Sequence, residues 1–338
     1  MKTALYASAA VIALAAFGTT AAFAQSRDTI QIAGSSTVLP FASIVAEEFG
    51  AAFPEFKTPV VGSGGTGGGL KQFCEGVGDN TIDIANASRE IKDSEREACT
   101  AAGVTDIREI QFGYDGIVFA SAASGPDFAL TPVQVYKAIA AKVPVDGALV
   151  DNPYTKWSEI DASLPDQPIA LAIPGTNHGT REVFQLEVVD AGAEEAGLPE
   201  GLTEEEHTAA LTTFRQDVVV EISGDYTETL ARLTSNPNTV GVFGLSFYDQ
   251  NKDTLKVATV NGITPSNETV AAGEYPVSRP LFFYVKGQHI GTIPGIEEYV
   301  QFFLSESAAG GSLEAAGLIP QPEEKTAEVL AAFEAGAQ

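Results

Sequence analysis

Short apolar runs alternate with helical patterns along this chain, and polar residues stand at the junctions between them. The first run covers 29–33, where Ile30 and Ile32 alternate with polar residues as in a half-buried strand. Apolar residues at helical spacing follow from 41 to 49, with Ser36 or Thr37 as the expected N-cap and a proline tolerated in the first turn. The start of the chain therefore predicts a strand that leads through a hydroxyl-rich junction into a helix.

The same alternation continues along the chain and predicts an α/β fold. Strand-like runs are expected at 58–62, 81–86, 107–112, 116–120, 169–173, 240–245 and 281–285. Helical patterns are expected from residue 70, and at 93–100, 132–141, 194–213, 296–305 and 325–335. Such a fold packs helices on the faces of a sheet, and its ligands bind beyond the carboxyl ends of strands, where helices begin.

A glycine-rich stretch at 61–72 follows the second strand, with six glycines in twelve residues. Glycine has no Cβ, so the backbone there can approach a ligand closely. The free N–H groups of a helix that begins after the stretch favour an anion. Ser63 and Thr66 are the candidate hydroxyls, and the alternative interpretation is a flexible surface turn.

Two further junctions combine hydroxyls with arginine. Ser88 and Arg89 follow the third strand, and the segment 177–181 follows the strand at 169–173, ending in Thr180 and Arg181. A guanidinium group suits bidentate recognition of an oxyanion, although each arginine and His178 in the same segment could equally be a solvated surface residue. Asp115, between two apolar runs, is either a turn residue or an acceptor that faces a cleft.

The composition adds limits to this picture. With 338 residues and 44% hydrophobic residues, the chain is globular, and its length suggests about two domains. The formal net charge of −26 argues against binding to nucleic acid or to anionic lipid, both of which require clustered Lys and Arg. An anion must therefore be attracted by local donors, because the overall field of the protein repels it.

The N-terminus resembles a processing signal. Lys2 precedes an apolar stretch from about 4 to 17, and Ala-Phe-Ala at 22–24 fits a cleavage pattern, so residues 1–24 are expected to be removed before Gln25. The apolar stretch is shorter than the ~20 residues of a membrane span, and no cysteine follows it for lipid attachment. We expect an exported protein of a bacterial periplasm. A retained membrane anchor is the alternative.

Cys74 and Cys99 are the two cysteines of the chain. An even number of cysteines in an exported protein predicts a disulfide, which would tie the helix after the glycine stretch to the next helix. Two buried free thiols are the alternative.

Catalysis is not expected. The chain has three histidines, no Gly-x-Ser-x-Gly elbow and no metal-ligand spacing, and its glycine stretch lacks the Gly-Lys-Ser/Thr ending of a nucleotide P-loop. These features argue against an exported phosphatase, and no cofactor or metal is expected.

Several segments together resemble bacterial phosphate-binding proteins of ABC importers, the PstS-like family. They are Gly-Ser-Ser-Thr-Val-Leu-Pro at 34–40, the end of the glycine stretch at 68–74, Asp-Ile-Ala-Asn-Ala-Ser-Arg at 83–89, His-Gly-Thr-Arg at 178–181 and Ser-Arg-Pro-Leu at 278–281. The resemblance implies a two-lobed periplasmic binding protein fold of type II, with lobes joined by crossing hinge strands. It places lobe I at 25–114 plus 279–338 and lobe II at 115–278.

The same resemblance implies high-affinity binding of inorganic phosphate between the lobes and delivery to membrane permease subunits of an ABC importer, by a monomer. Another oxyanion such as sulfate is the alternative ligand. The implied phosphate-binding residues are Ser36, Thr37, Val38, Ser63, Thr66, Ser88, Arg89, Asp115, His178, Gly179, Thr180 and Arg181.

Two positions depart from the family pattern. Pro174 stands where relatives often carry an arginine, and Ser88-Arg89, as found in another branch, stands where one branch has Ser-Asp, whose aspartate accepts the proton of phosphate. Arg89 or Arg181, or both, would then supply the positive charge, and Asp115 would replace the lost acceptor.

Overall fold

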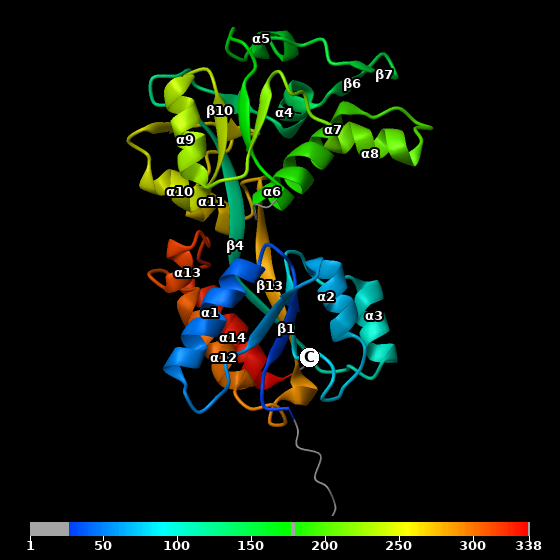
Figure 1. Cartoon of the computed structure of the whole chain (residues 1–338), viewed down its shortest axis with the longest axis vertical. Helices are drawn as coiled ribbons and strands as arrows, with labels where there is room; N and C mark the ends of the chain where they lie inside the picture. The colour runs from blue at the N-terminus through cyan, green and yellow to red at the C-terminus, as the bar shows by residue number, and fades with distance from the viewer. Residues whose placement is uncertain (1–26, 177–179, 337–338) are drawn as a thin grey trace, which may run out of the picture.

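Two groups of helices and strands lie at opposite ends of the molecule, and two long strands connect them (Figure 1). The computed structural model describes residues 27–176 and 180–336. The connecting strands are β4, Ile107–Ala122, and β13, Ser278–Lys286. The predicted α/β fold is confirmed. The expected signal peptide and its cleavage site lie outside the described residues.

One group, drawn at the bottom of Figure 1, contains both terminal parts of the described chain. Its elements are β1 Gln31–Gly34, α1 Leu39–Ala52, β2 Val60–Ser63, α2 Gly65–Phe73, β3 Ile84–Ala87, α3 Asp93–Ala101, η2 Gly287–His289, α12 Ile296–Glu306, α13 Ser312–Ala315 and α14 Glu323–Ala335.

The other group contains the middle of the chain. Its elements are β5 Ala129–Leu130, α4 Pro132–Ile139, β6 Lys142–Val145, β7 Ala148–Asp151, α5 Trp157–Ile160, β8 Leu171–Pro174, α6 Thr180–Val183, the π-helix η1 Phe184–Asp190, α7 Ala191–Ala196, α8 Glu204–Thr212, β9 Val219–Ile222, α9 Tyr226–Ser235, β10 Val240–Gly244, α10 Leu245–Gln250, β11 Leu255–Val257, β12 Thr259–Val260 and α11 Asn267–Ala271.

Strand β4 joins the two groups because it changes partners along its length. Its first part, up to Gly116, pairs antiparallel with β13, and from Ile117 it pairs antiparallel with β10. The order β2-β1-β3-β13-β4-β10-β8-β9 therefore runs through both groups. Each group still has its own apolar core. One buried cluster consists almost entirely of residues within 117–277, and two others consist of residues before and after this range. The expected lobe bounds, 25–114 plus 279–338 and 115–278, stay a prediction.

Two local expectations from the sequence were wrong. Residues 107–120 were expected as two strands around a turn, but Asp115 lies inside continuous β4, where pairing with β13 holds the backbone extended. The glycine stretch was expected as a loop, but α2 already begins at Gly65. The glycine that the packing requires is Gly69, since a Cβ there would lie 2.4 Å from the Cα of Gly34 on β1.

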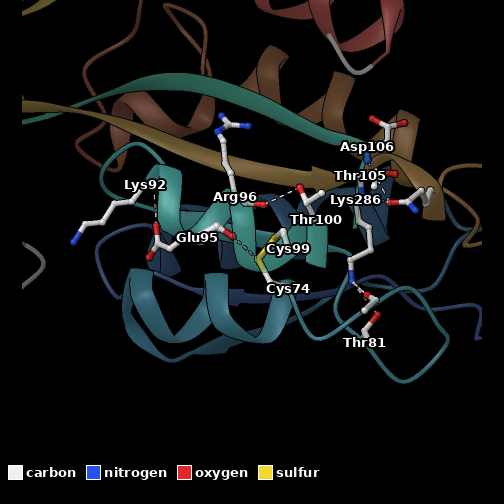
Figure 2. The surroundings of a disulfide bond; sticks show 12 residues. Cys74, Thr81, Lys92, Glu95, Arg96, Cys99, Thr100, Thr105, Asp106 and Lys286 are labelled. Atoms are coloured by element: carbon white, nitrogen blue, oxygen red, sulfur yellow. Dashed lines mark hydrogen bonds between the residues drawn. A yellow bond between two sulfur atoms is a disulfide. The ribbon is translucent and has the colours of Figure 1, made fainter. Parts of the chain in front are cut away.

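A disulfide joins Cys74, just after α2, to Cys99 in α3, as expected (Figure 2). It fastens together two helices on the same side of the sheet, next to the buried side chains of Leu70 and Phe73. No helix within 27–176 and 180–336 is both long and apolar enough to cross a membrane.

Candidate functional site

Arg279 lies at the start of β13, beside the point where β4 changes partners. It is directly opposite Asp115 in the antiparallel register of β13 and β4, and the two residues are only 6% and 7% exposed. The Nη2 atom of Arg279 is 3.9 Å from Oδ2 of Asp115. This Oδ2, and Nε of Arg279, are buried without a hydrogen-bond partner in the described part of the chain. A buried guanidinium with unused donor capacity is suited to holding an anion.

Hydroxyl groups from three junctions lie at this end of the sheet, and one of them contacts the guanidinium directly. Nη2 of Arg279 donates to Oγ1 of Thr37, which precedes α1, at 2.9 Å. Ser88 follows β3, and its Oγ is 3.0 Å from Oγ1 of Thr66 in the first turn of α2. All three hydroxyl residues are buried. The strand order β2-β1-β3-β13 explains this convergence, because the ends of neighbouring strands meet at one edge of the sheet.

Glu182 on α6 supplies an anion to these donors from the other group of elements. Its Oε2 accepts a hydrogen bond from Oγ1 of Thr37 at 2.6 Å and lies 3.2 Å from Nη2 of Arg279. Its Oε1 accepts a long hydrogen bond, 3.5 Å, from Oγ of Ser88. We call Thr37, Ser88 and Arg279 the donor cluster. In this structure the donor cluster is occupied by a carboxylate.

A cavity of about 290 Å³ adjoins the donor cluster. Its polar lining includes Thr37, Asp115, Thr180, Tyr226 and Ser246, so both groups of elements contribute. The phenol of Tyr226 donates to Oγ1 of Thr180 at 3.1 Å. The cavity is lined by hydroxyl donors and by one carboxylate. This combination suits an anion that also carries a proton, because the hydroxyls can donate to its oxygens and the carboxylate can accept its proton.

The carboxylates around Arg279 differ in their acidity. Burial raises the pKa of Asp115 to about 6, against the attraction of Arg279, and the charge of Glu182 raises it as well. Burial also acts to raise the pKa of Glu182, but the Arg279 charge and the hydrogen bonds from Thr37, Arg279 and Ser88 outweigh it and lower the pKa. Burial raises the pKa of Glu187 on η1, again against Arg279. Glu182 is thus the preferred anionic partner of the guanidinium.

The remaining predicted residues of the first two junctions lie outside the donor cluster. Ser36 is exposed, and Val38 is buried with its N–H directed at Oγ of Ser35 at 3.4 Å. Val38 is also the N-cap residue of α1, so neither Ser36 nor Thr37 caps this helix as expected. Ser63 is exposed at the end of β2.

The two predicted arginines are engaged elsewhere. Arg89 forms a bidentate pair with Glu95, with both N–O distances 2.9 Å, and its side chain is 36% exposed. Arg181 donates to the carbonyl of Pro174 and to Glu221, both at 2.8 Å. The structure brings neither to the donor cluster. His178 and Gly179 lie outside the described residues.

Sequence reasoning missed Arg279 and Glu182 as site residues. Arg279 was noticed only as part of the motif at 278–281, and its position next to a proline in an apolar run was the available signal. Glu182 stands beside Arg181 in the fourth junction, but an acidic residue does not suggest an anion site. Its role depends on a contact between segments 145 residues apart.

Comparisons with known proteins show the family of this chain and support its fold. A family model described as a PBP superfamily domain matches residues 19–307. The chain is 32% identical over 295 residues to the protein SphX of Synechococcus elongatus, covering 86% of this chain and 76% of the relative. It is 29% identical over 297 residues to the phosphate-binding protein PstS of Staphylococcus epidermidis, covering 86% and 78%. The crystal structure of a possible phosphate binding protein from Planctomyces limnophilus has a TM-score of 0.69 at 28% identity, covering 91% of this chain and 98% of that chain.

Proposed function

This chain belongs to the PBP superfamily, in the family of the SphX and PstS proteins, and we propose that it binds inorganic phosphate and delivers it to an ABC importer. The observation that carries the proposal is the donor cluster, in which a buried guanidinium and two hydroxyls from separate junctions converge on one anion. A desolvated oxyanion needs such charged and neutral donors to replace its hydration.

We assign the charge recognition to Arg279. It is 6% exposed and donates to Thr37, which lines the cavity, whereas Arg89 and Arg181 are held by Glu95 and Glu221. Replacing Arg279 by Ala should weaken phosphate binding by several kcal/mol, as expected when a buried hydrogen-bonded charge pair loses one partner. Calorimetry on the variants Arg279→Ala, Arg89→Ala and Arg181→Ala tests this assignment. A large loss for Arg89→Ala with little loss for Arg279→Ala would return the role to Arg89.

Among the predicted hydroxyls, Thr37, Thr66 and Ser88 are our proposed phosphate ligands, with Thr180 on α6, which also lines the cavity. Their burial and mutual contacts support them, whereas Ser63 and Ser36 are exposed. Thr66→Val should therefore weaken phosphate binding, while Ser63→Ala leaves it unchanged. The reverse result in the same calorimetric titration would exchange the two roles.

Asp115 is our proposed selectivity residue. Asp115 lines the cavity, and its unpartnered Oδ2 is an acceptor for the proton of hydrogen phosphate, which sulfate lacks at neutral pH. A fixed carboxylate then repels sulfate, so discrimination comes from a built-in repulsive contact. Asp115→Asn should relax discrimination against sulfate. Competition binding that still excludes sulfate would remove Asp115 from this role.

We further propose that the protein is exported to the periplasm after cleavage before Gln25, and works there as a monomer without a cofactor, without nucleic acid and without catalysis.

Calorimetry with phosphate, sulfate and arsenate is the decisive experiment, and binding of phosphate in preference to sulfate is the expected result. Tight sulfate binding without phosphate binding would contradict the proposal. Turnover of a chromogenic phosphate ester would contradict its non-catalytic part, and mass spectrometry of the exported protein locates the mature N-terminus.

A further inference from the structure

Glu182 has an unusual position for a carboxylate in a protein that binds anions. Its two oxygens contact all three members of the donor cluster, at 2.6 Å to Thr37, 3.2 Å to Arg279 and 3.5 Å to Ser88. A carboxylate and a phosphate use the same kind of acceptor oxygen towards guanidinium and hydroxyl donors. The side chain of Glu182 therefore satisfies the groups that an incoming oxyanion would need.

We propose that Glu182 is an internal ligand, which holds the donor cluster in the unliganded protein and must be displaced when an oxyanion binds. This inference rests on the proposed function for the identity of the oxyanion. It makes Glu182 a determinant of affinity, because any contact present in the unliganded state and lost in the liganded state weakens binding.

Charge repulsion also requires that Glu182 be displaced when an oxyanion binds. Among the described residues, Arg279 is the cation at the cluster, and the charged or titratable groups that act on it are Glu182, Asp115 and Glu187, together with the phenol of Tyr226 beside Asp115. A phosphate bound to this guanidinium would lie against an ionised Glu182, and two like charges at such short range repel each other. The low pKa of Glu182 keeps the side chain ionised at neutral pH, so movement rather than protonation is the expected response.

The same contact also joins the two groups of elements. Glu182 lies on α6, which belongs to the group drawn at the top of Figure 1, whereas Thr37 and Ser88 belong to the group at the bottom. A phosphate between the lobes would make the same connection in its place. Glu182 thus acts as a latch that favours a closed form before the ligand arrives, and its removal should allow the unliganded protein to open.

The side chain of Glu182 has the freedom that displacement needs. This side chain is 41% exposed, in contrast to 6% for the side chain of Arg279 and 10% for that of Asp115, so its carboxylate can turn towards solvent. Solvent at the carboxylate also limits what the latch contributes. We therefore expect its removal to tighten phosphate binding by about tenfold, the factor that one charged hydrogen bond is worth.

Calorimetry on the full chain, freed of bound phosphate, tests the affinity effect. Glu182→Ala should bind inorganic phosphate about tenfold more tightly than the wild type, and Glu182→Gln should fall between the two. Glu187→Gln is the matched control, because this side chain also acts on Arg279 but makes no hydrogen bond within the described residues. Its affinity should change less than threefold. Weaker binding by Glu182→Ala, or equal gains in Glu182→Ala and Glu187→Gln, would overturn the inference.

Small-angle scattering in the absence of any phosphate tests the latch independently of the ligand. Glu182→Ala should have a larger radius of gyration than the wild type and Glu187→Gln, and addition of phosphate should return it to the compact value. An unliganded Glu182→Ala as compact as the wild type would overturn the latch. If no variant binds phosphate, the proposed function fails, and the scattering comparison still decides whether Glu182 holds the two groups of elements together.

Discussion

Asp115 is expected to make this protein less stable at neutral pH than it would be with an uncharged side chain. It is 7% exposed, and its Oδ2 has no hydrogen bond in the described part of the chain. Burial raises its pKa from the ordinary value of 3.8 to about 6. A carboxyl group that is less acidic when folded binds more protons in the folded state, so folding stability falls as the pH rises between these two values.

The size of this effect follows from the two pKa values. The gap between 3.8 and about 6 corresponds to about 3 kcal/mol, since one pKa unit is worth about 1.4 kcal/mol. This loss of folding stability is complete above the pKa of the folded state and is small at pH 4. Asp115→Asn keeps the shape of the side chain and removes the charge. We therefore expect the variant to be more stable than the wild type by up to about 3 kcal/mol at pH 8, and by less than about 1 kcal/mol at pH 4.

Urea unfolding of the phosphate-free protein at pH 4, 6 and 8 measures this difference. Asp127→Asn is a suitable control, because its carboxylate is 89% exposed and pairs with Lys256 on the surface. The control should stay within about 0.5 kcal/mol of the wild type at each pH. A stability difference between Asp115→Asn and the wild type that is the same at pH 4 and pH 8, or a destabilised variant at pH 8, would refute the reasoning.

Two further predictions concern α2 and its disulfide. Gly69→Ala should destabilise the protein by about 1–3 kcal/mol, because its Cβ would lie 2.4 Å from the Cα of Gly34, whereas Gly68→Ala meets no atom within 4 Å and should stabilise α2 by up to about 1 kcal/mol. Thermal unfolding of the two variants checks this, and equal effects would contradict it. Replacing Cys74 and Cys99 by Ser should cost about 3 kcal/mol of unfolding free energy in denaturant titrations, as expected for a loop of 25 residues, and an unchanged midpoint would contradict it.

The sequence alone predicted the class of fold and most of its elements, because these depend on local patterns. Apolar alternation and helical spacing are properties of neighbouring residues, so β1, α1, β8 and α12 appear close to where the patterns lie. The disulfide was also predictable from the sequence. An even number of cysteines in a chain with an export signal indicates an oxidising compartment, where disulfides form.

Local patterns also misled where a neighbouring strand or helix decides the conformation. Residues 113–115 have the composition of a turn, but pairing with β13 keeps them in one strand. Gly64 to Gly69 have low intrinsic helix propensity, and α2 forms there because the helix packs on β1, with Gly69 against Gly34. In both places a contact with a distant segment outweighs the preference of the residues themselves.

The charged part of the site was decided by tertiary structure. From the sequence, Arg89 and Arg181 were the natural anion ligands because they follow strands, but each has a carboxylate partner nearby, and only the fold shows these pairs. Arg279 becomes the buried cation because β13 lies beside β4 and places it opposite Asp115. Glu182 reaches the donor cluster only because α6 faces the start of α1. Hydroxyls at strand ends are visible in a sequence, whereas the pairing of charges depends on distances of a few ångströms between remote segments.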